Sequence, residues 1–408
     1  MKIVIIGNGT AGITAASTIK KRNPSVSITL ITQESYPYYP KPNLIEFMAG
    51  RINLKEVFVR NLDWYRSKGI SLLSKNRVLK VNFALREVIL EKGEVVNYDT
   101  LLIASGSKPN LPRVKGVEWV KVFTLGNLES CFSLMEKAGK EGEALIIGGG
   151  ILGLEVAKAL KDTSVEKITV LEQSDYLLSR QLDKKGGEIL GERFREMGVE
   201  VIYTAKTKEL VQIDSGAKVV LEDGRELITP VVIACIGTTP ETKYLTSSGL
   251  QVNRGVVVDK HLKTDVADVF AAGDVAEFEG KTWGIIPAAM EQGEVAGLSM
   301  LGEEVEYKGT IPSNRLKVAG INLFSMGTID PQPDDGCTAI IKNEEAKGVY
   351  KKAVFNSEGK LIGIIMLGST TGVNQFSRLI KEGVNCLHFG SDLLEEGFNL
   401  QSVFPVIR

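Results

Sequence analysis

The sequence predicts an α/β protein, in which two parallel-sheet domains are followed by a smaller α+β region. Glycine-rich turns of the form G-x-G-x-x-G stand between a strand and a helix at residues 7–12 and again at 148–153. From about residue 311 the pattern changes to short alternating strands. A chain of 408 residues is also too long for one hydrophobic core and suggests two or three domains.

The first glycine-rich turn, GNGTAG, belongs to a complete strand–turn–helix–strand unit. An apolar strand from Ile3 leads into it, an Ala-rich helix runs to about Lys21, and a second strand covers residues 27–32. In such a turn the first glycine permits a tight reversal, the second lets the backbone approach a pyrophosphate, and the third lets helix and strand pack closely. Glu34 follows the second strand, where a carboxylate can accept hydrogen bonds from a ribose. The three glycines are Gly7, Gly9 and Gly12.

The same unit recurs in the middle of the chain. A strand at 143–147 leads into GGGILG, a helix covers residues 154–161, and a strand at 167–171 is followed by Glu172. Two complete fingerprints in one chain predict two bound dinucleotides and two Rossmann-like domains. Without ligands, several glycines and both acids would have no reason to be present. The corresponding glycines are Gly148, Gly150 and Gly153.

Three further strands end in small residues. Residues 101–106 and 232–237 end in a small residue and glycine, where a chain can pass close to a cofactor. Residues 264–274 end on Gly273 and Asp274. Asp274 is expected at a strand end, where such sheets bind ligands, and this favours hydroxyl binding by its carboxylate. Capping of a helix is the alternative. The residues at the first two strand ends are Ala104, Ser105, Gly106 and Gly237.

Composition excludes several classes of function. The formal net charge of -1 offers no basic surface for nucleic acid. No window approaches the roughly 20 apolar residues of a membrane helix, and the first apolar run is interpreted as a strand instead of a targeting sequence. We therefore expect a cytoplasmic protein without membrane contact. The four cysteines and two histidines form no metal or dithiol motif, so no metal site is expected.

These motifs resemble the two-dinucleotide flavoprotein superfamily that includes glutathione reductase, over essentially the whole chain. The resemblance implies FAD on the first fingerprint and NADH, with NADPH as the alternative, on the second. Within the superfamily, four segments are similar to the NADH:rubredoxin oxidoreductases and to the FAD/NAD part of assimilatory nitrite reductase. These are KPNL at 41–44, LDWYR at 62–66, GGGILGLE at 148–155 and AAMEQG at 288–293.

The resemblance also implies contacts to the cofactors. In the superfamily the A-x-G-D segment meets the ribityl chain and the pyrophosphate of FAD, which here implies Gly273 and Asp274. The remaining cofactor-binding residues that it implies are Pro42, Val78, Glu291 and Gln292.

The segment YPYYPKPNLIEF, residues 36–47, contains no cysteine. Disulfide reductases of the superfamily carry cysteines over the flavin, where this chain has Lys41, Pro42 and Asn43. The His-Pro and Glu of dithiol enzymes are also missing from residues 399–408. Thiol–disulfide chemistry is therefore not expected. We interpret the Tyr and Pro cluster as a rigid wall for the flavin and Lys41 as a charge that stabilises the reduced, anionic flavin; a surface Pro-rich turn is the alternative.

Glu155 is expected in the first turn of the second dinucleotide helix. A carboxylate there complements the helix dipole whatever its function. In relatives with the same G-x-x-G-x-E spacing, this glutamate reaches toward the junction of nicotinamide and flavin and can pair with a lysine. Glu155 and Lys41 are therefore the predicted catalytic residues, with Lys41 as the candidate partner of Glu155.

The predicted architecture has three parts. An FAD domain comprises residues 1–112 and 241–310, an NAD(P)H domain residues 113–240, and an α+β interface domain residues 311–408. In this last domain we expect strands at 316–321, 351–355 and 361–367 and a helix at 373–381. Such a layer usually covers the far side of the flavin and carries an acceptor or dimer contact.

The predicted function is FAD-dependent electron transfer from NADH to a small iron or iron–sulfur carrier such as rubredoxin. Three alternatives stay open: an electron-input subunit of a larger iron–sulfur or nitrite-reducing complex, an NADH oxidase, and an NADH-responsive redox sensor. Both a monomer and a homodimer formed through the C-terminal domain stay open as well.

Overall fold

The computed structural model describes residues 1–246, 248–318 and 320–404. The chain divides into two compact units, each built from segments that are distant in sequence. None of the described helices is long and apolar enough to cross a membrane. The first unit comprises Met1–Asn110, Thr124–Leu134 and Gly237–Thr310, and the second comprises Leu111–Phe123, Met135–Ile236 and the chain from Ile311.

A five-stranded parallel sheet forms the centre of the first unit. Its strand order is β19-β7-β1-β2-β3, and all four pairings are parallel. β7 is buried along its whole length and β1 from its second residue on, as expected for a parallel sheet that is covered on both faces. The strands are β1 (Lys2–Ile6), β2 (Ser27–Ile31), β3 (Ile70–Leu73), β7 (Thr100–Ile103) and β19 (Val269–Ala271).

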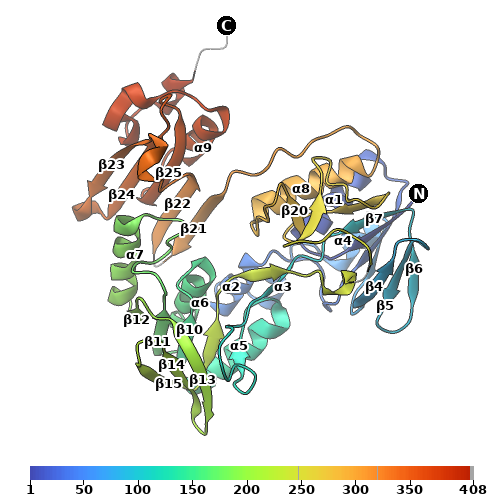
Figure 1. The fold of residues 1–408 in the computed structure, drawn as a ribbon, viewed down its shortest axis with the longest axis horizontal. Helices are drawn as coiled ribbons and strands as arrows, with labels where there is room; N and C mark the ends of the chain where they lie inside the picture. The colour runs from blue at the N-terminus through green and yellow to red at the C-terminus, as the bar shows by residue number, and fades with distance from the viewer. Residues whose placement is uncertain (247, 319, 405–408) are drawn as a thin grey trace. The chain divides into compact units, whose positions relative to one another are not determined.

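Two long helices of this unit, α1 (Thr10–Arg22) and α8 (Ile286–Ser299), lie side by side (Figure 1). Glycines on α8 make the approach close. A Cβ on Gly293 would lie 2.5 Å from the carbonyl oxygen of Ala11. Because no side chain fits there, the middle of α8 is fixed beside the first turn of α1.

Shorter elements complete the first unit. Residues 42–67 form three short helices, and an antiparallel three-stranded sheet has the order β4-β5-β6. These elements are α2 (Pro42–Met48), α3 (Leu54–Val57), α4 (Leu62–Ser67), β4 (Val78–Asn82), β5 (Glu87–Leu90), β6 (Val95–Asn97), β8 (Ser107–Pro109), β17 (Thr238–Pro240), η1 (Lys243–Leu245), β18 (Val256–Val258) and β20 (Ala276–Phe278). α5 (Leu128–Glu141) begins in the first unit and ends in the second.

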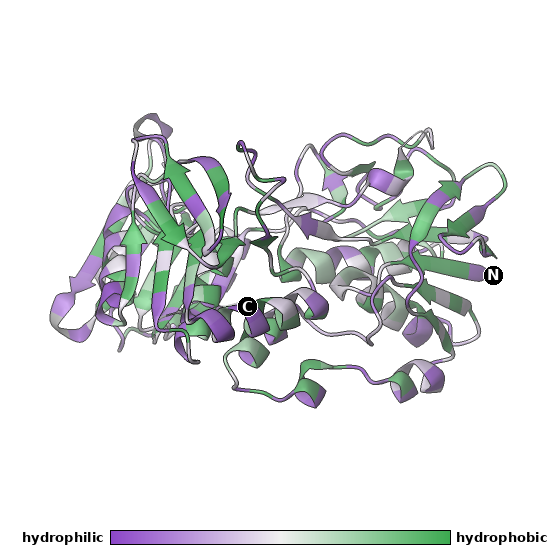
Figure 2. Ribbon diagram, turned by 90° about the horizontal axis from the view of Figure 1, so that it is seen from below, coloured by the Kyte–Doolittle hydropathy of each residue, from purple (hydrophilic) through white to green (hydrophobic). Residues whose placement is uncertain are grey.

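The second unit repeats the parallel arrangement with the order β12-β11-β10-β16-β9. Apolar residues concentrate along the strands and polar residues on loops and outer helix faces (Figure 2). The elements are β9 (Val122–Phe123), β10 (Glu143–Ile147), α6 (Ile151–Lys161), β11 (Lys167–Leu171), α7 (Lys184–Glu196), β12 (Val199–Ile202), β13 (Thr207–Ile213), β14 (Gly216–Leu221), β15 (Glu226–Thr229) and β16 (Val232–Ala234). β13, β14 and β15 form an antiparallel sheet of their own.

The C-terminal part of the second unit is an antiparallel sheet of order β21-β22-β25-β24-β23 with helix α9. Phe355, Phe376 and Leu379 belong to its apolar core. The elements are β21 (Ser313–Val318), β22 (Ile321–Gly327), η2 (Pro333–Asp335), β23 (Thr338–Glu344), η3 (Glu345–Lys347), β24 (Val349–Phe355), β25 (Leu361–Gly368), α9 (Val373–Glu382), η4 (Leu387–Leu394) and η5 (Leu400–Val403).

The predicted strands at 351–355 and 361–367 and the helix at 373–381 lie inside β24, β25 and α9. The predicted strand at 316–321 is wrong, because the chain reverses within it. Val318 pairs with Ile321 across an antiparallel hairpin, and Gly320 has a φ of +77°. Apolar alternation continues on both sides of this short turn and hides it in the sequence. Ala319 lies outside the described residues.

A buried polar cluster ties α7 to the C-terminal sheet. Asp183 caps α7 by accepting a hydrogen bond from Gly186 N at 3.1 Å. Its other oxygen accepts a hydrogen bond from Tyr350 Oη at 2.6 Å and lies 3.1 Å from Lys352 Nζ. Burial and the Asp183 carboxylate raise the pKa of Tyr350, so its hydroxyl remains a donor.

We predict that Asp183→Ala lowers the free energy of unfolding by about 3–5 kcal/mol, because the buried Tyr350 hydroxyl loses its acceptor and the buried Lys352 ammonium keeps only Asp330, at 3.5 Å. Urea unfolding followed by circular dichroism measures the loss. The control is Arg195→Ala, which removes an exposed ion pair on the same helix and should change stability by less than about 1 kcal/mol. Equal effects of the two substitutions would show that the cluster does not stabilise the unit.

Candidate functional site

The three glycines of the first fingerprint have different surroundings. Gly7 has a φ of +115°, and a Cβ there would lie 2.0 Å from the carbonyl oxygen of Ala104. A Cβ on Gly12 would lie 2.1 Å from the carbonyl oxygen of Gly7, whereas a Cβ on Gly9 would meet nothing within 4 Å. The packing of the chain therefore requires Gly7 and Gly12. Gly9 opens onto free space, as a turn that leaves room for a pyrophosphate should.

The second fingerprint repeats this division. A Cβ on Gly148 would lie 2.5 Å from the carbonyl oxygen of Cys235, and one on Gly153 would lie 1.9 Å from that of Gly148. A Cβ on Gly150 would again meet nothing within 4 Å. Gly149, which the sequence analysis did not single out, is restricted too, since its Cβ would lie 2.8 Å from Glu172 Oε2.

Both fingerprint helices begin without a side-chain cap. The N-cap residues are Gly9 for α1 and Gly150 for α6, and neither helix has an acidic residue in its first turn. Unpaired N–H groups at the positive end of a helix dipole bind phosphate. Together with the open space at Gly9 and Gly150, they fit the diphosphate of a dinucleotide at each site.

The structure corrects the position of Glu155. α6 begins at Ile151, so Glu155 is its fifth residue and lies just beyond the first turn. Stabilisation by the helix dipole falls off beyond the first turn, so it explains this glutamate less well than the sequence suggested.

Glu34 and Lys41, which the sequence analysis assigned to different parts of the FAD, contact each other. Lys41 Nζ donates to Glu34 Oε1 at 3.2 Å and to the carbonyl oxygen of Gly126 at 2.6 Å. The other Glu34 oxygen accepts a hydrogen bond from Tyr39 Oη. Burial and the Glu34 charge raise the pKa of Tyr39. Sequence spacing gave no sign of this Glu34, Tyr39 and Lys41 triad beyond the repeated tyrosines.

Pro42 has a structural task that the sequence analysis did not assign. It is the first residue of α2, where its missing N–H costs nothing and its fixed φ suits the helix.

Gly273, Asp274 and Gln292 lie together beside α1. Gly273 N donates to Gln292 Oε1 at 2.7 Å, and Gln292 is 1% exposed. A Cβ on Gly273 would lie 2.9 Å from Ala11 Cβ. Asp274 Oδ2 accepts a hydrogen bond from Ser107 Oγ at 2.7 Å. The element that follows Asp274 is strand β20, so the alternative of a helix cap is wrong.

The other predicted residues of the strand ends also find partners. Ser105 Oγ donates to the carbonyl oxygen of Glu241 at 2.9 Å and accepts a hydrogen bond from Tyr244 Oη at 3.1 Å. Gly106 and Gly237 have φ values of +69° and +89°. The left-handed conformation explains why both are glycine.

Two further predicted residues belong to the first unit. Val78 is buried at the start of β4. Glu291 accepts a hydrogen bond from Thr310 Oγ1 at 2.5 Å. This hydrogen bond does not involve a fingerprint residue.

Glu172 follows β11 and is held by its own backbone surroundings. Its oxygens accept hydrogen bonds from Gly149 N at 2.9 Å and from Ser174 N at 2.7 Å. A carboxylate has about four lone-pair sites, so roughly two remain for ribose hydroxyls.

The cysteines are poorly suited to thiol chemistry. Burial raises the pKa of Cys131 to about 11, that of Cys235 to about 12 and that of Cys386 to about 11. The thiolate is the reactive form, so these thiols are inert near neutral pH. Cys337 is partly exposed. Within residues 1–246, 248–318 and 320–404, no group of three His, Cys, Asp or Glu side chains could hold a metal ion.

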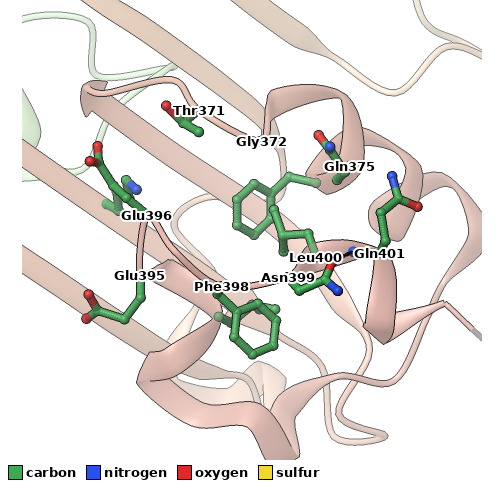
Figure 3. Close-up of a pocket in the computed structure, with 12 residues that line it drawn as sticks. Thr371, Gly372, Gln375, Glu395, Glu396, Phe398, Asn399, Leu400 and Gln401 are labelled. Atoms are coloured by element: carbon green, nitrogen blue, oxygen red, sulfur yellow. Dashed lines mark hydrogen bonds between the residues drawn. The ribbon is translucent and has the colours of Figure 1, made fainter.

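A pocket of about 170 Å³ lies in the C-terminal part (Figure 3). It is smaller than the roughly 300–1,000 Å³ of typical ligand pockets and includes no predicted site residue. A hydrogen bond with Ser369 and the charge of Lys351 lower the pKa of Glu396. Glu395 is a second carboxylate in the lining, and the repulsion from two carboxylates disfavours a diphosphate. The pocket is therefore not a dinucleotide site. Labelled lining residues in Figure 3 include Thr371, Gln375, Glu396, Phe398 and Gln401.

The sequence is similar to those of several reductases and electron-transfer subunits. The chain is 33% identical over 330 residues to the NADH-rubredoxin oxidoreductase of Clostridium acetobutylicum, covering 81% of this chain and 82% of that protein. It is 30% identical over 371 residues to the assimilatory nitrate reductase electron transfer subunit of Bacillus subtilis, covering 90% of this chain and 48% of that protein. It is 28% identical over 384 residues to a nitrite reductase of B. subtilis, covering 93% of this chain and 47% of that protein. The chain thus spans about half the length of the two B. subtilis relatives.

Solved structures agree in fold. The crystal structure of NADH:rubredoxin oxidoreductase from C. acetobutylicum has a TM-score of 0.76 at 29% identity and covers 94% of this chain and 95% of its own. A NAD-dependent persulfide reductase from A. fulgidus has a TM-score of 0.86 at 24% identity, covering 94% of this chain and 77% of its own. This second comparison shows a likeness of fold alone. The predicted α/β fold class is confirmed.

Family models match most of the chain. Residues 312–384 match the rubredoxin NAD+ reductase C-terminal domain, and residues 1–293 match the pyridine nucleotide-disulphide oxidoreductase family. The predicted superfamily and its cofactors, FAD and NADH, are confirmed. The chain therefore belongs to the pyridine nucleotide-disulphide oxidoreductase family.

Proposed function

We propose that the protein is an FAD-dependent oxidoreductase that passes electrons from NADH to a small iron protein such as rubredoxin, without a redox-active disulfide. One observation carries the proposal: each of two fingerprints has a middle glycine that opens onto free space beside an uncapped helix N-terminus. The match of residues 312–384 to a rubredoxin reductase domain supports the acceptor class. The proposal includes a cytoplasmic location.

FAD is assigned to the first unit. The N-terminus of α1 and the turn at Gly9 would hold the diphosphate, Glu34 a ribose and Asp274 the ribityl hydroxyls. When bound, FAD supplies hydride acceptance and one-electron release. The proposed domains are residues 1–112 and 241–310 for FAD, 113–240 for NAD(P)H and 311–408 for the partner interface, where a homodimer contact is a further proposal.

NADH is assigned to the second fingerprint. The start of α6 at Gly150 would bind the diphosphate, and Glu172 the adenosine ribose. Glu155 would act at the junction of nicotinamide and flavin. A pairing of Glu155 with Lys41 requires the ammonium to leave Glu34 and the carbonyl oxygen of Gly126. The Lys41 side chain is 56% exposed, so this exchange costs little desolvation.

A second function is favoured by the lengths of the relatives. Because the chain spans 48% of a nitrate reductase electron transfer subunit, it also fits the electron-input part of a larger nitrate- or nitrite-reducing assembly. An NADH oxidase and an NADH-responsive sensor use the same two sites but deliver electrons to oxygen or to no partner.

NADH oxidation by the purified protein, measured anaerobically with rubredoxin and separately in air without it, distinguishes these functions. We expect oxidation to depend on added rubredoxin, because residues 36–47, where disulfide reductases of the superfamily carry cysteines over the flavin, contain none. Equal rates with oxygen alone would indicate an oxidase. Reduction of bound FAD without turnover on any iron protein would contradict the proposed acceptor class and favour the subunit or the sensor.

We predict that Asp274→Ala raises the dissociation constant of FAD about tenfold or more, since hydrogen bonds to a charged group are worth about 1.5–3 kcal/mol. Flavin fluorescence quenching during titration of the apoprotein measures this constant. Asp265→Ala serves as the control, because Asp265 is an exposed acid of the same segment that accepts from Gln251 N. An unchanged constant in Asp274→Ala would remove Asp274 from the FAD site.

We predict a preference for NADH over NADPH that shrinks in Glu172→Ala. A 2′-phosphate about 4 Å from a carboxylate meets roughly 4 kcal/mol of repulsion per unit charge at an effective dielectric near 20. Even a third of this repulsion energy corresponds to about a tenfold difference in affinity between the two nucleotides. Steady-state kcat/KM values for both nucleotides measure the preference, which Glu192→Ala on α7 should leave unchanged. A wild-type kcat/KM for NADPH at or above that for NADH would contradict the role of Glu172.

A further inference from the structure

Tyr65 connects two segments of the candidate FAD site. The residue lies on α4 and is 2% exposed. Its hydroxyl donates to Asn8 Oδ1 at 2.9 Å and accepts a hydrogen bond from Tyr38 N at 3.0 Å. Asn8 lies between Gly7 and Gly9 in the fingerprint turn. Tyr38 lies in the thiol-free segment, residues 36–47, a few residues before Lys41. One buried hydroxyl therefore contacts both segments.

Further contacts hold Tyr38 in the same place. Tyr38 Oη lies 3.2 Å from Thr10 Oγ1, at the first residue of α1. The carbonyl oxygen of Tyr38 accepts hydrogen bonds from Val59 N at 3.2 Å and Arg60 N at 3.4 Å. The thiol-free segment is thus fixed to the fingerprint on one side and to the entry of α4 on the other.

Local structure aims the Tyr65 hydroxyl. Asn61 caps α4 by accepting a hydrogen bond from Trp64 N at 3.0 Å. The Trp64 ring packs edge-on against Tyr65 at 5.1 Å, and the Arg60 guanidinium lies 5.2 Å from the Trp64 ring centroid. Burial raises the pKa of Tyr65, so the hydroxyl keeps its proton and remains able to donate.

We propose that Tyr65 is a positioning residue for FAD binding, an inference that rests on the proposed binding of FAD at the first fingerprint. Asn8 has glycine on both sides, and glycine leaves the backbone many accessible conformations. The hydrogen bond from Tyr65 restricts Asn8, so the N–H groups of the turn are presented before the ligand arrives. The bond from Tyr38 N holds the segment leading to Lys41 in register with the turn. Such preorganisation lowers the entropic cost of binding.

The test compares Tyr65→Phe with Tyr98→Phe. Tyr65→Phe removes only the hydroxyl, so Asn8 Oδ1 loses its donor and Tyr38 N loses its acceptor. The second removes a buried hydroxyl that has no hydrogen-bond partner, in the same unit and with 4% exposure of the residue. Titration of the apoproteins with FAD should show a dissociation constant about tenfold higher for Tyr65→Phe and within about twofold of wild type for Tyr98→Phe.

Two further measurements distinguish positioning from general destabilisation. Hydrogen exchange of the apoproteins should be faster at residues 7–12 and 36–41 in Tyr65→Phe alone. In an Asn8→Ala background, Tyr65→Phe should weaken FAD binding less than it does in the wild type, because the two residues act through one hydrogen bond. Should Tyr65→Phe fail to fold, Asn8→Ala itself must raise the dissociation constant by a similar factor.

Each outcome decides a separate statement. FAD affinities of Tyr65→Phe and Tyr98→Phe that are both equal to that of the wild type would overturn the positioning role. A wild-type apoprotein that binds no FAD would overturn the proposed function, and the exchange rates at residues 7–12 and 36–41 would still decide whether Tyr65 orders the two segments.

Discussion

The approach of a glycine turn to the neighbouring strand end is the constraint on which each nucleotide unit depends. Gly7 packs against the carbonyl of Ala104 and Gly148 against that of Cys235, at distances where no side chain fits. This approach places the start of each fingerprint helix directly after a tight turn. The N–H groups of that helix start are left uncapped, and the middle glycine stays clear of protein atoms. A phosphate site is therefore a consequence of how the strands and helix pack.

Packing around α1 extends this constraint through the first unit. Gly293 of α8 meets the carbonyl of Ala11, and Gly273 meets its Cβ, so residues far apart in sequence converge on the first turn of α1. Gln292, nearly fully buried, then fixes the backbone of Gly273 by a hydrogen bond. Asp274 gains its position from this bond. The site thus inherits its geometry from backbone contacts that tolerate no Cβ, and substitutions at these glycines would shift several site residues together.

Local chemistry made much of this predictable from the sequence. Each fingerprint glycine, both strand-end acids and the parallel strands follow from short motifs whose spacing has a steric reason. The Glu34, Tyr39 and Lys41 triad and the bond from Tyr65 to Asn8 depend on which side chains meet after folding, and spacing does not encode that. Strand periodicity likewise continued across the hairpin at Gly320, because a turn this short does not interrupt apolar alternation.

The Glu34, Tyr39 and Lys41 triad also affects the electrostatic repulsion that a bound flavin dinucleotide would meet. A diphosphate brings negative charge close to Glu34, and the Lys41 ammonium at 3.2 Å from that carboxylate offsets part of the repulsion. Tyr39 and Lys41 occupy about two of the four lone-pair sites of Glu34, so ribose hydroxyls need not displace either partner. In the proposed FAD site, Lys41 would therefore favour binding of the cofactor from its position beside Glu34, before any movement toward the flavin ring or toward Glu155.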